Sequence, residues 1–192
     1  MPTASSRTSV AAVVVTWNRR DLLEQSLDAI LSQEPAPDRV IVVDNASTDG
    51  TSEFVAEHYP AHRFPTLQLI TCTQNTGGAG GFALGIAAAL EPGPDPEPDA
   101  IWLMDDDTIP QPGALAALVA AREGYAAEPG GPPGPPVVIA SRVEWIDGRA
   151  HPMNTPRVKR GATPGERGAA LDVGCEPVPT GSFVSTLLRA DQ

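Results

Sequence analysis

The stretch Ile101-Trp102-Leu103-Met104-Asp105-Asp106-Asp107 places four apolar residues directly before three consecutive acids. Pro98-Asp99-Ala100 precedes it, and the apolar run predicts a short buried strand. The end of that strand then presents three carboxylates at one point. Crowded carboxylates repel one another and raise each other's pKa unless a cation neutralises them. The stretch therefore predicts a divalent metal that holds a phosphorylated ligand at the end of a strand.

The three acids have different expected roles, because side chains alternate along an extended chain. Asp105 and Asp107 point the same way and are the predicted metal ligands. Asp106 faces the sugar of the ligand or makes a structural hydrogen bond. Oxygen ligands of this kind suit Mg²⁺ or Mn²⁺. The alternative is that the acids only cap the helix after Pro110 or form a solvated turn.

The composition is that of a folded, acidic protein. The chain has 192 residues, of which 41% are hydrophobic and 19% charged, as expected for one globular domain or for one domain and part of another. A formal net charge of −11 disfavours binding to nucleic acid or anionic lipid, because both require a basic surface. A phosphorylated ligand must therefore be neutralised locally, by a metal or by helix N-termini.

Neither the cysteines nor the apolar runs indicate export. Cys72 and Cys175 are the only cysteines, and a reduced intracellular pair is expected because we find no secretory signal. Residues 1–9 are polar, and no run reaches the roughly 18 apolar residues of a membrane span. We expect a cytoplasmic protein. Any association with the inner face of the plasma membrane is expected to use parts that this sequence does not contain.

Strand and helix patterns alternate along residues 10–125. Continuous apolar runs predict strands buried on both faces at residues 10–15, 40–43 and 101–104, and a further strand is predicted at residues 67–70. A helical pattern follows each of them. Four βα units in a row predict an α/β fold, with a mostly parallel sheet flanked by helices.

Ligands of such sheets bind at the carboxyl ends of the strands. A cluster of polar or small residues follows each predicted strand, at residues 16–20, 44–49, 75–81 and 105–107. We therefore expect these four clusters to converge in space, although they are far apart in the sequence.

Polar residues in the first two clusters are candidates for nucleotide binding. Asp44 ends a buried strand, where an acid can accept hydrogen bonds from a base edge or from ribose hydroxyls. The alternative for Asp44 is a cap for the turn at residues 47–50. Thr16, Asn18 and Arg19 are candidates for contacts with a nucleobase and a phosphate. The alternative for Arg19 is a surface position in the first helical turn.

The glycine-rich segment after the third strand has two interpretations. Gly78-Ala79-Gly80-Gly81-Phe82-Ala83 fits the dinucleotide fingerprint G-x-G-x-x-A, which would indicate a nicotinamide or flavin oxidoreductase. That fingerprint normally lies in the first βα unit, however, and the interpretation gives the three acids no role. Small residues here more simply let a diphosphate and a sugar approach the backbone and a helix N-terminus.

Four motifs occur in order: Val-Val-Val-Thr-Trp-Asn-Arg at 13–19, Val-Val-Asp-Asn-Ala-Ser-Thr-Asp-Gly at 42–50, Asn-Thr-Gly-Gly-Ala-Gly-Gly-Phe at 75–82 and Trp-Leu-Met-Asp-Asp-Asp at 102–107. Together they resemble the inverting family 2 glycosyltransferases with a GT-A fold, over residues 10–125. The glycine-rich motif looks like that of the actinobacterial galactofuranosyltransferases that start the cell-wall galactan. Rhamnosyltransferases of the same family are near neighbours.

The resemblance implies a metal-dependent, inverting transfer of galactofuranose from a UDP-sugar to a glycan acceptor linked to polyprenyl diphosphate. Nucleic acid has no part in it. The implied ligand is Mn²⁺ or Mg²⁺, held by Asp105 and Asp107. The implied substrate contacts are Thr16, Asn18, Arg19 and Asp44 for uridine, and Asn75, Gly78 and Asp106 for the diphosphate or sugar.

We divide the chain on this basis. Residues 1–9 are expected to be a disordered N-terminus, residues 10–127 a nucleotide-sugar-binding domain, and residues 128–136 a Pro/Gly loop. Residues 137–192 are expected to start an acceptor-binding part. This part contains a strand at 137–140, a hairpin turn at 145–149 and an irregular basic stretch at 150–170.

Members of the family carry the general base, and often a metal-binding His, beyond the region that corresponds to residues 178–189. This sequence ends at Gln192, and its late acids lack the right setting: Glu166, Asp172, Glu176 and Asp191. We therefore expect a C-terminal truncation. Two functions remain open, a glycosyltransferase and a fragment that binds nucleotide sugar without turnover.

Overall fold

The computed structural model describes residues 7–92, 97–125, 136–150, 153–181 and 184–191. The start of the expected N-terminal tail and most of the expected Pro/Gly loop lie outside these residues. The elements are β1 (Val10–Thr16), α1 (Arg20–Leu31), β2 (Arg39–Asp44), α2 (Thr51–His58), β3 (Leu67–Thr71), α3 (Gly77–Leu90), β4 (Ala100–Asp105), α4 (Ala114–Gly124), β5 (Val138–Ala140), α5 (Pro164–Asp172) and β6 (Thr186–Arg189).

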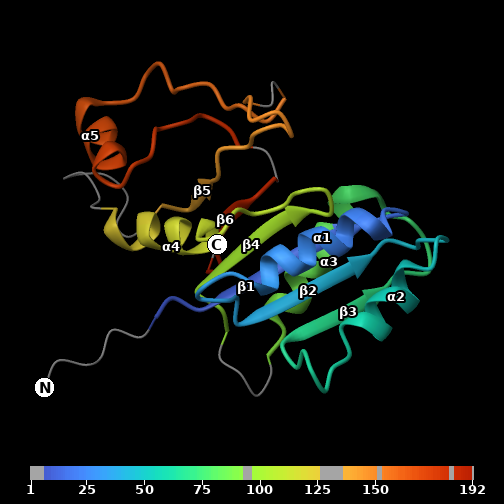
Figure 1. Cartoon of the computed structure of the whole chain (residues 1–192). Helices are drawn as coiled ribbons and strands as arrows, with labels where there is room; N and C mark the ends of the chain where they lie inside the picture. Colours follow the sequence, from blue (N-terminus) through green and yellow to red (C-terminus); the bar gives the residue numbers. More distant parts are fainter. Residues whose placement is uncertain (1–6, 93–96, 126–135, 151–152, 182–183, 192) are drawn as a thin grey trace, which may run out of the picture.

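The strands form one six-stranded sheet in the order β3-β2-β1-β4-β6-β5 (Figure 1). β1 to β4 run parallel, and β6 runs antiparallel to its neighbours β4 and β5. On the β6 side of β4, the indole nitrogen of the buried Trp102 donates a hydrogen bond to the hydroxyl of Ser185 at 3.1 Å. The predicted α/β fold with a mostly parallel sheet is confirmed.

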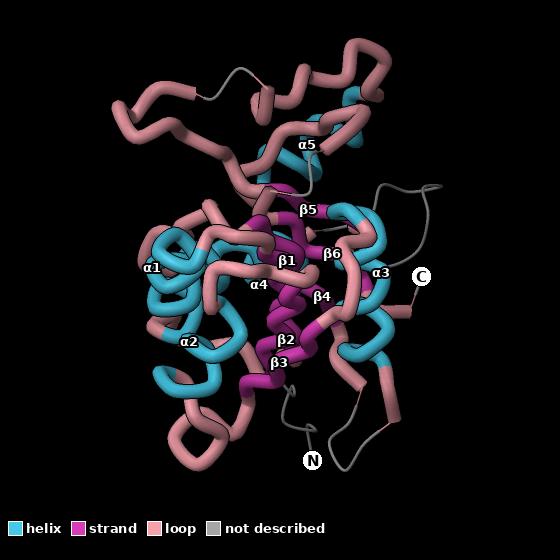
Figure 2. The backbone as a smooth tube through the Cα atoms, turned by 90° about the vertical axis from the view of Figure 1, so that its right-hand side faces the viewer, coloured by secondary structure: helices cyan, strands magenta, loops and turns pink. Residues whose placement is uncertain are grey.

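Helices cover both faces of the sheet. Val10, Ala12 and Val14 of β1 belong to the core beneath α1, α2 and α4, whereas the alternate residues of β1 face α3. Figure 2 shows α1 and α2 on one side of the strands and α3 on the other. Because both faces of β1, β2 and β4 are buried, these strands need apolar residues at nearly every position, which explains their continuous apolar runs.

The glycine-rich segment forms the first turns of α3 and does not precede that helix. A Cβ built on Gly81 would lie 2.5 Å from Cγ1 of Val15, and one on Gly85 would lie 2.4 Å from Cγ1 of Val13. These glycines therefore let α3 approach β1 closely. At the start of the helix, a Cβ on Gly78 would meet no atom within 4 Å.

Between β5 and β6 the chain leaves the sheet (Figure 1). We call residues 141–150 and 153–181 the excursion. Its hairpin turn is confirmed, since the Trp145 N–H donates to the Arg149 carbonyl at 2.7 Å and the Gly148 N–H donates to the Trp145 carbonyl at 2.8 Å. In the described part of the chain, no helix is long and apolar enough to cross a membrane.

The expectation that residues 150–170 are irregular is wrong for their second half, where α5 begins. The hydroxyl of Thr163 accepts a hydrogen bond from the Glu166 N–H at 3.0 Å, and Pro164 occupies the first helical position. Both features stabilise a helix start without requiring an apolar pattern.

Candidate functional site

The carboxyl ends of the parallel strands lie at one edge of the sheet. In register, Thr16 at the end of β1 pairs with Asp44 at the end of β2, and Val15 pairs with Asp105 of β4. The loops that follow the four strands are joined by side-chain hydrogen bonds: Thr16 to Asp106, Asn18 to Ser47, and Asn45 to Asn75. The predicted convergence of the four clusters is therefore confirmed.

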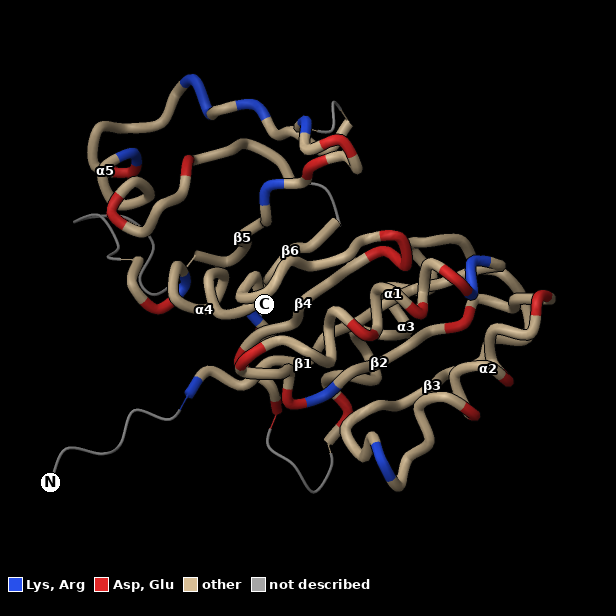
Figure 3. The backbone as a smooth tube through the Cα atoms, viewed as in Figure 1, with Lys and Arg blue, Asp and Glu red and all other residues tan. Residues whose placement is uncertain are grey.

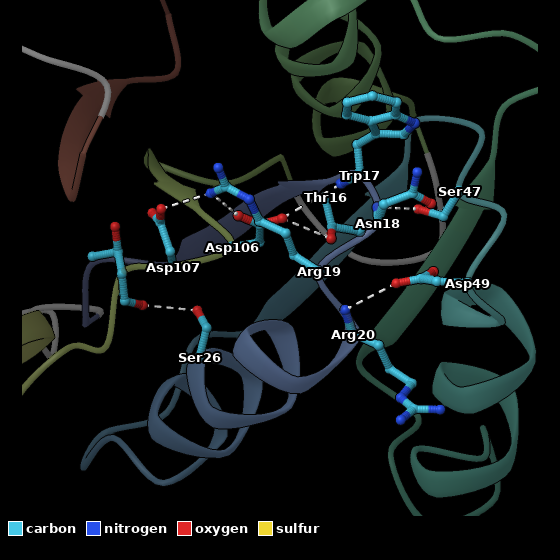
Figure 4. Close-up of polar contacts among 11 residues, drawn as sticks. Thr16, Trp17, Asn18, Arg19, Arg20, Ser26, Ser47, Asp49, Asp106 and Asp107 are labelled. Atoms are coloured by element: carbon cyan, nitrogen blue, oxygen red, sulfur yellow. Dashed lines mark hydrogen bonds and ion pairs between the residues drawn. The ribbon is translucent and has the colours of Figure 1, made fainter.

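Asp106 is the buried member of the three acids, with 5% of its surface exposed. Its carboxylate accepts hydrogen bonds from the Thr16 hydroxyl at 2.8 Å, from Nη1 of Arg19 at 3.3 Å and from the Trp17 N–H at 3.4 Å (Figure 4). Burial raises the pKa of Asp106, although the Thr16 hydrogen bond and the Arg19 charge oppose this. Asp106 thus fastens the loop after β4 to the loop after β1, which is the structural alternative given for it above.

Arg19 neutralises two of the acids at once. Its Nη1 atom lies 3.3 Å from Oδ1 of Asp106 and 2.6 Å from Oδ2 of Asp107. Attraction to Asp106 is the main cause that raises the pKa of Arg19. The Arg19 and Asp107 side chains are both about half exposed, so this pair can exchange for other partners at little cost.

Asp105 has a different environment. Among the described residues, none donates a hydrogen bond to its carboxylate, which is partly buried. Burial raises the pKa of Asp105, and repulsion from Asp107 and Asp106 raises it further, against the attraction of Arg19. Asp105 and the exposed Asp107 beside it together form a pair of hard oxygen donors, which a divalent cation would stabilise.

No group of three His, Cys, Asp or Glu residues that could hold a metal occurs in the ranges that the structure describes. The residue types at Asp105 and Asp107 fit Mg²⁺ or Mn²⁺, and a ligand such as a diphosphate would have to supply further oxygens.

The predicted uridine contacts in the first two loops are held by local hydrogen bonds. Asp44 is 1% exposed, and its carboxylate accepts hydrogen bonds from the Ser47 N–H at 2.8 Å and from the Ser52 hydroxyl. Asn18 adopts a left-handed conformation (φ +53°), and its side-chain oxygen accepts from the Thr48 N–H at 2.7 Å. These bonds fix the loops that border the edge of the sheet.

Asn45 is a site residue that sequence reasoning did not single out. It is 2% exposed, and its amide nitrogen donates to Oδ1 of Asn75 and to the carbonyl of Gly77, each at 3.0 Å. Its amide oxygen accepts from the Thr76 N–H at 3.0 Å. Asn45 therefore positions the N-terminus of α3, where Gly78 leaves open space. The available signal was an amide, both donor and acceptor, directly after a strand-ending acid.

Comparison with known proteins assigns the family. The family described as glycosyl transferase family 2 matches residues 11–127, more than half of the chain. The chain belongs to glycosyl transferase family 2. Galactofuranosyltransferase GlfT1 of Mycolicibacterium smegmatis is 48% identical over 101 residues, which cover 53% of this chain and 30% of that protein. GlfT1 of Mycobacterium tuberculosis is 42% identical over 118 residues, which cover 61% of this chain and 36% of that protein. The match thus spans about a third of these curated relatives.

Solved structures of other glycosyltransferases share the fold. TarS 1–349 of S. aureus aligns with a TM-score of 0.61 and 19% identity, over 95% of this chain and 47% of that one. The mannosyltransferase PcManGT of Pyrobaculum calidifontis, solved with GDP-Man and Mn²⁺, aligns with a TM-score of 0.51 and 29% identity, over 60% of this chain and 32% of that one. The predicted GT-A fold is confirmed.

The dinucleotide interpretation loses its basis. The first glycine of the fingerprint should form the tight turn between strand and helix, but Gly78 already lies inside α3. Family membership assigns the same segment to a glycosyltransferase.

Proposed function

We propose that this chain is the donor-binding part of a metal-dependent, inverting glycosyltransferase that takes galactofuranose from a UDP-sugar. The observation that carries the proposal is the contrast within the acid triplet. Asp106 is buried and hydrogen-bonded, whereas Asp105 is partly buried without a donor and Asp107 is exposed beside it. The similarity to galactofuranosyltransferases supports the sugar, and the Mn²⁺ of PcManGT supports the metal.

In this proposal, each acid has a separate task. Asp105 and Asp107 would hold Mn²⁺ or Mg²⁺, which when bound neutralises the charge of a departing diphosphate. Asp106 holds the loop after β4 against β1 and so orients the other two carboxylates. Arg19 adds positive charge at the edge that would receive the diphosphate. The open first turn of α3 at Gly78 offers a helix N-terminus to the same group.

The residues proposed to border the nucleoside already use their side chains in hydrogen bonds within the protein. The side chains of Thr16, Asn18 and Asp44 already bond within the loops, and the oxygen of Asn75 accepts from the Gly77 N–H at 2.7 Å. We therefore assign these residues the task of shaping the walls of a uridine site. Their side chains would not have to be released before the nucleotide enters.

The proposed acceptor is a lipid-linked glycan of cell-wall synthesis, as the resemblance of the four sequence motifs implies. In the sheet register, Thr186 of β6 pairs with Ala140 of β5 on one side and with Leu103 of β4 on the other. The excursion therefore leaves the sheet at the same edge that carries the acids. A cavity of about 1070 Å³ between α4, β5 and the excursion includes Arg142 and Lys159 in its lining. This size suits a small-molecule or sugar ligand.

Calorimetric titration with UDP tests the donor and the metal together. UDP should bind only in the presence of Mn²⁺ or Mg²⁺, and the double variant Asp105→Ala, Asp107→Ala should lose this binding. Asp21→Ala is the matched control, because it removes a carboxylate that is 82% exposed in the first turn of α1. Equally tight binding of UDP without metal would overturn the metal role.

The second candidate function is nucleotide-sugar binding without turnover. It is favoured by two late acids that are engaged in ion pairs, since Glu166 pairs with Lys159 at 2.8 Å and Asp191 with Arg189 at 2.8 Å. Transfer from UDP-galactofuranose to a glycan acceptor distinguishes the two functions. Turnover by the 192-residue chain alone would exclude the second.

A further inference from the structure

One part of the excursion has a charge opposite to that of the whole chain. Residues 142–160 contain five basic and two acidic residues, although the chain carries a formal net charge of −11. We call the described residues of this range, 142–150 and 153–160, the basic segment. Figure 3 shows its Lys and Arg positions along the excursion, which stands away from the helices α1, α2 and α3.

The hairpin turn of the basic segment presents large apolar side chains to solvent. Ile146 is 95% exposed and Trp145 is 56% exposed, and Met153, which follows the hairpin in the sequence, is 84% exposed. The turn is closed by the hydrogen bond between the Trp145 N–H and the Arg149 carbonyl, which holds Ile146 at the tip. A group of exposed apolar side chains next to basic residues marks an interaction surface.

The positive charge of the basic segment is only partly compensated. Arg142 pairs with Glu144 at 3.0 Å and Arg149 with Asp147 at 3.7 Å, and such exposed pairs are weak. Lys159 pairs with Glu166 of α5. Arg157 and Arg160 are exposed, and neither takes part in an ion pair with another described residue.

We infer that the basic segment docks on an anionic lipid bilayer, with Trp145 and Ile146 entering the headgroup region and Arg157 and Arg160 facing lipid phosphates. The apolar tip favours a bilayer over a soluble polyanion, because Ile146 gains only from contact with hydrocarbon and the Trp indole suits the interface. Basic residues near the surface add electrostatic attraction.

The acidic remainder of the chain does not prevent this docking. At physiological salt, charges further apart than about 8 Å are largely screened, so a local patch governs the approach to a surface. The sequence argument against anionic lipid used the net charge of the whole chain, which hides the local excess at residues 142–160. The inference is independent of the proposed sugar and metal, because none of its residues belongs to the acid triplet or its loops.

Co-sedimentation with lipid vesicles measures the docking. The chain should bind vesicles of phosphatidylcholine with about one third phosphatidylserine, and not vesicles of phosphatidylcholine alone. The double variant Arg157→Ala, Arg160→Ala should lower the partition coefficient about 25-fold, at about fivefold for each arginine. Ile146→Ser should lower it about tenfold or more. Arg63→Ala and Leu84→Ser are the controls, since both side chains are exposed outside the excursion, and neither should change binding.

Quenching by brominated acyl chains reports the depth of the hairpin. A Trp17→Phe background removes the exposed indole of the candidate site, and Trp102 is fully buried, so quenching then reports Trp145. We expect quenching with anionic vesicles only. Three results would overturn the inference: equal binding to neutral and anionic vesicles, a partition coefficient that Ile146→Ser leaves unchanged, or absence of quenching. A vesicle-free dimer that dissociates on Ile146→Ser would assign the surface to a second copy of the chain and also overturn it.

Discussion

Substitution of Asp106 should lower the free energy of unfolding, whereas substitution of the adjacent Asp105 should not. Asp106→Ala removes the acceptor of the Thr16 hydroxyl, a residue that is 1% exposed, and of the Trp17 N–H. An unpaired buried hydroxyl costs about 1–3 kcal/mol. Loss of the half-exposed Arg19 pair adds up to about 1 kcal/mol. Asp106→Ala should therefore destabilise the fold by about 1–4 kcal/mol, a large part of the usual 5–15 kcal/mol.

Asp105→Asn should leave the metal-free fold as stable as before, or make it more stable, at neutral pH. Its carboxylate has no hydrogen-bond donor among the described residues, and both burial and its acidic neighbours disfavour the ionised form. The neutral amide of similar shape removes that cost. The two acids thus serve different ends, since Asp106 stabilises the fold and Asp105 is kept at the expense of stability.

Urea unfolding followed by the fluorescence of the buried Trp102 measures both effects. The slope with urea should stay unchanged in both variants, because each folded state buries the same surface. A similar loss of stability in the two variants, or a larger loss in Asp105→Asn, would refute the separation of structural and ligand-binding roles.

Three further outcomes are expected from the same contacts. The stability advantage of Asp105→Asn over the unsubstituted protein should shrink as the pH falls. Because the pKa of Asp105 is raised in the folded state, its protonated carboxyl contributes stability that is fully present below the unfolded pKa of about 3.9 and is lost as the pH rises through the folded pKa. Urea titrations at several pH values measure this change. Gly85→Ala should destabilise the fold by up to about 2 kcal/mol, because overpacking against Val13 costs about 1–3 kcal/mol and the higher helix propensity of Ala returns about 1 kcal/mol. Gly78→Ala is the control, because a Cβ at Gly78 meets open space. Equal thermal stability of the two variants would contradict the packing role of Gly85. Asn45→Ala should cost about 1–3 kcal/mol and weaken UDP binding in calorimetry, and unchanged values would remove its role at the start of α3.

The architecture could be predicted from the sequence because its physical cause is local. A parallel strand covered on both faces must be apolar at every position, as residues 10–15 are, and a helix between parallel strands brings the strand ends to one edge. These inferences need only the order of the residues. The alternation argument does not extend to Asp106 and Asp107, because β4 ends at Asp105 and these two acids lie in the turn that follows.

Other features depend on contacts that the order of residues does not encode. The pairing of Arg19 with Asp106 and Asp107 requires the path of the loop after β1, and the role of Asn45 requires the position of α3. The helix α5 was missed because its start is stabilised by Thr163 and Pro164, whereas most of its turns carry no apolar face. In such a segment, the hydrophobic period gives no signal.

The pairing of β4 with β6 has a consequence for a growing polypeptide. β4 ends at Asp105, the first of the three acids, and lies next to β1, but its other side is covered by residues 186–189, which are added more than 80 positions later. During synthesis, β4 therefore remains an edge strand with free backbone amides and carbonyls until those residues emerge. An uncovered edge is a template for pairing with strands of other chains. A nascent chain that ends before residue 186 would therefore expose the strand that leads into the three acids as an open sheet edge.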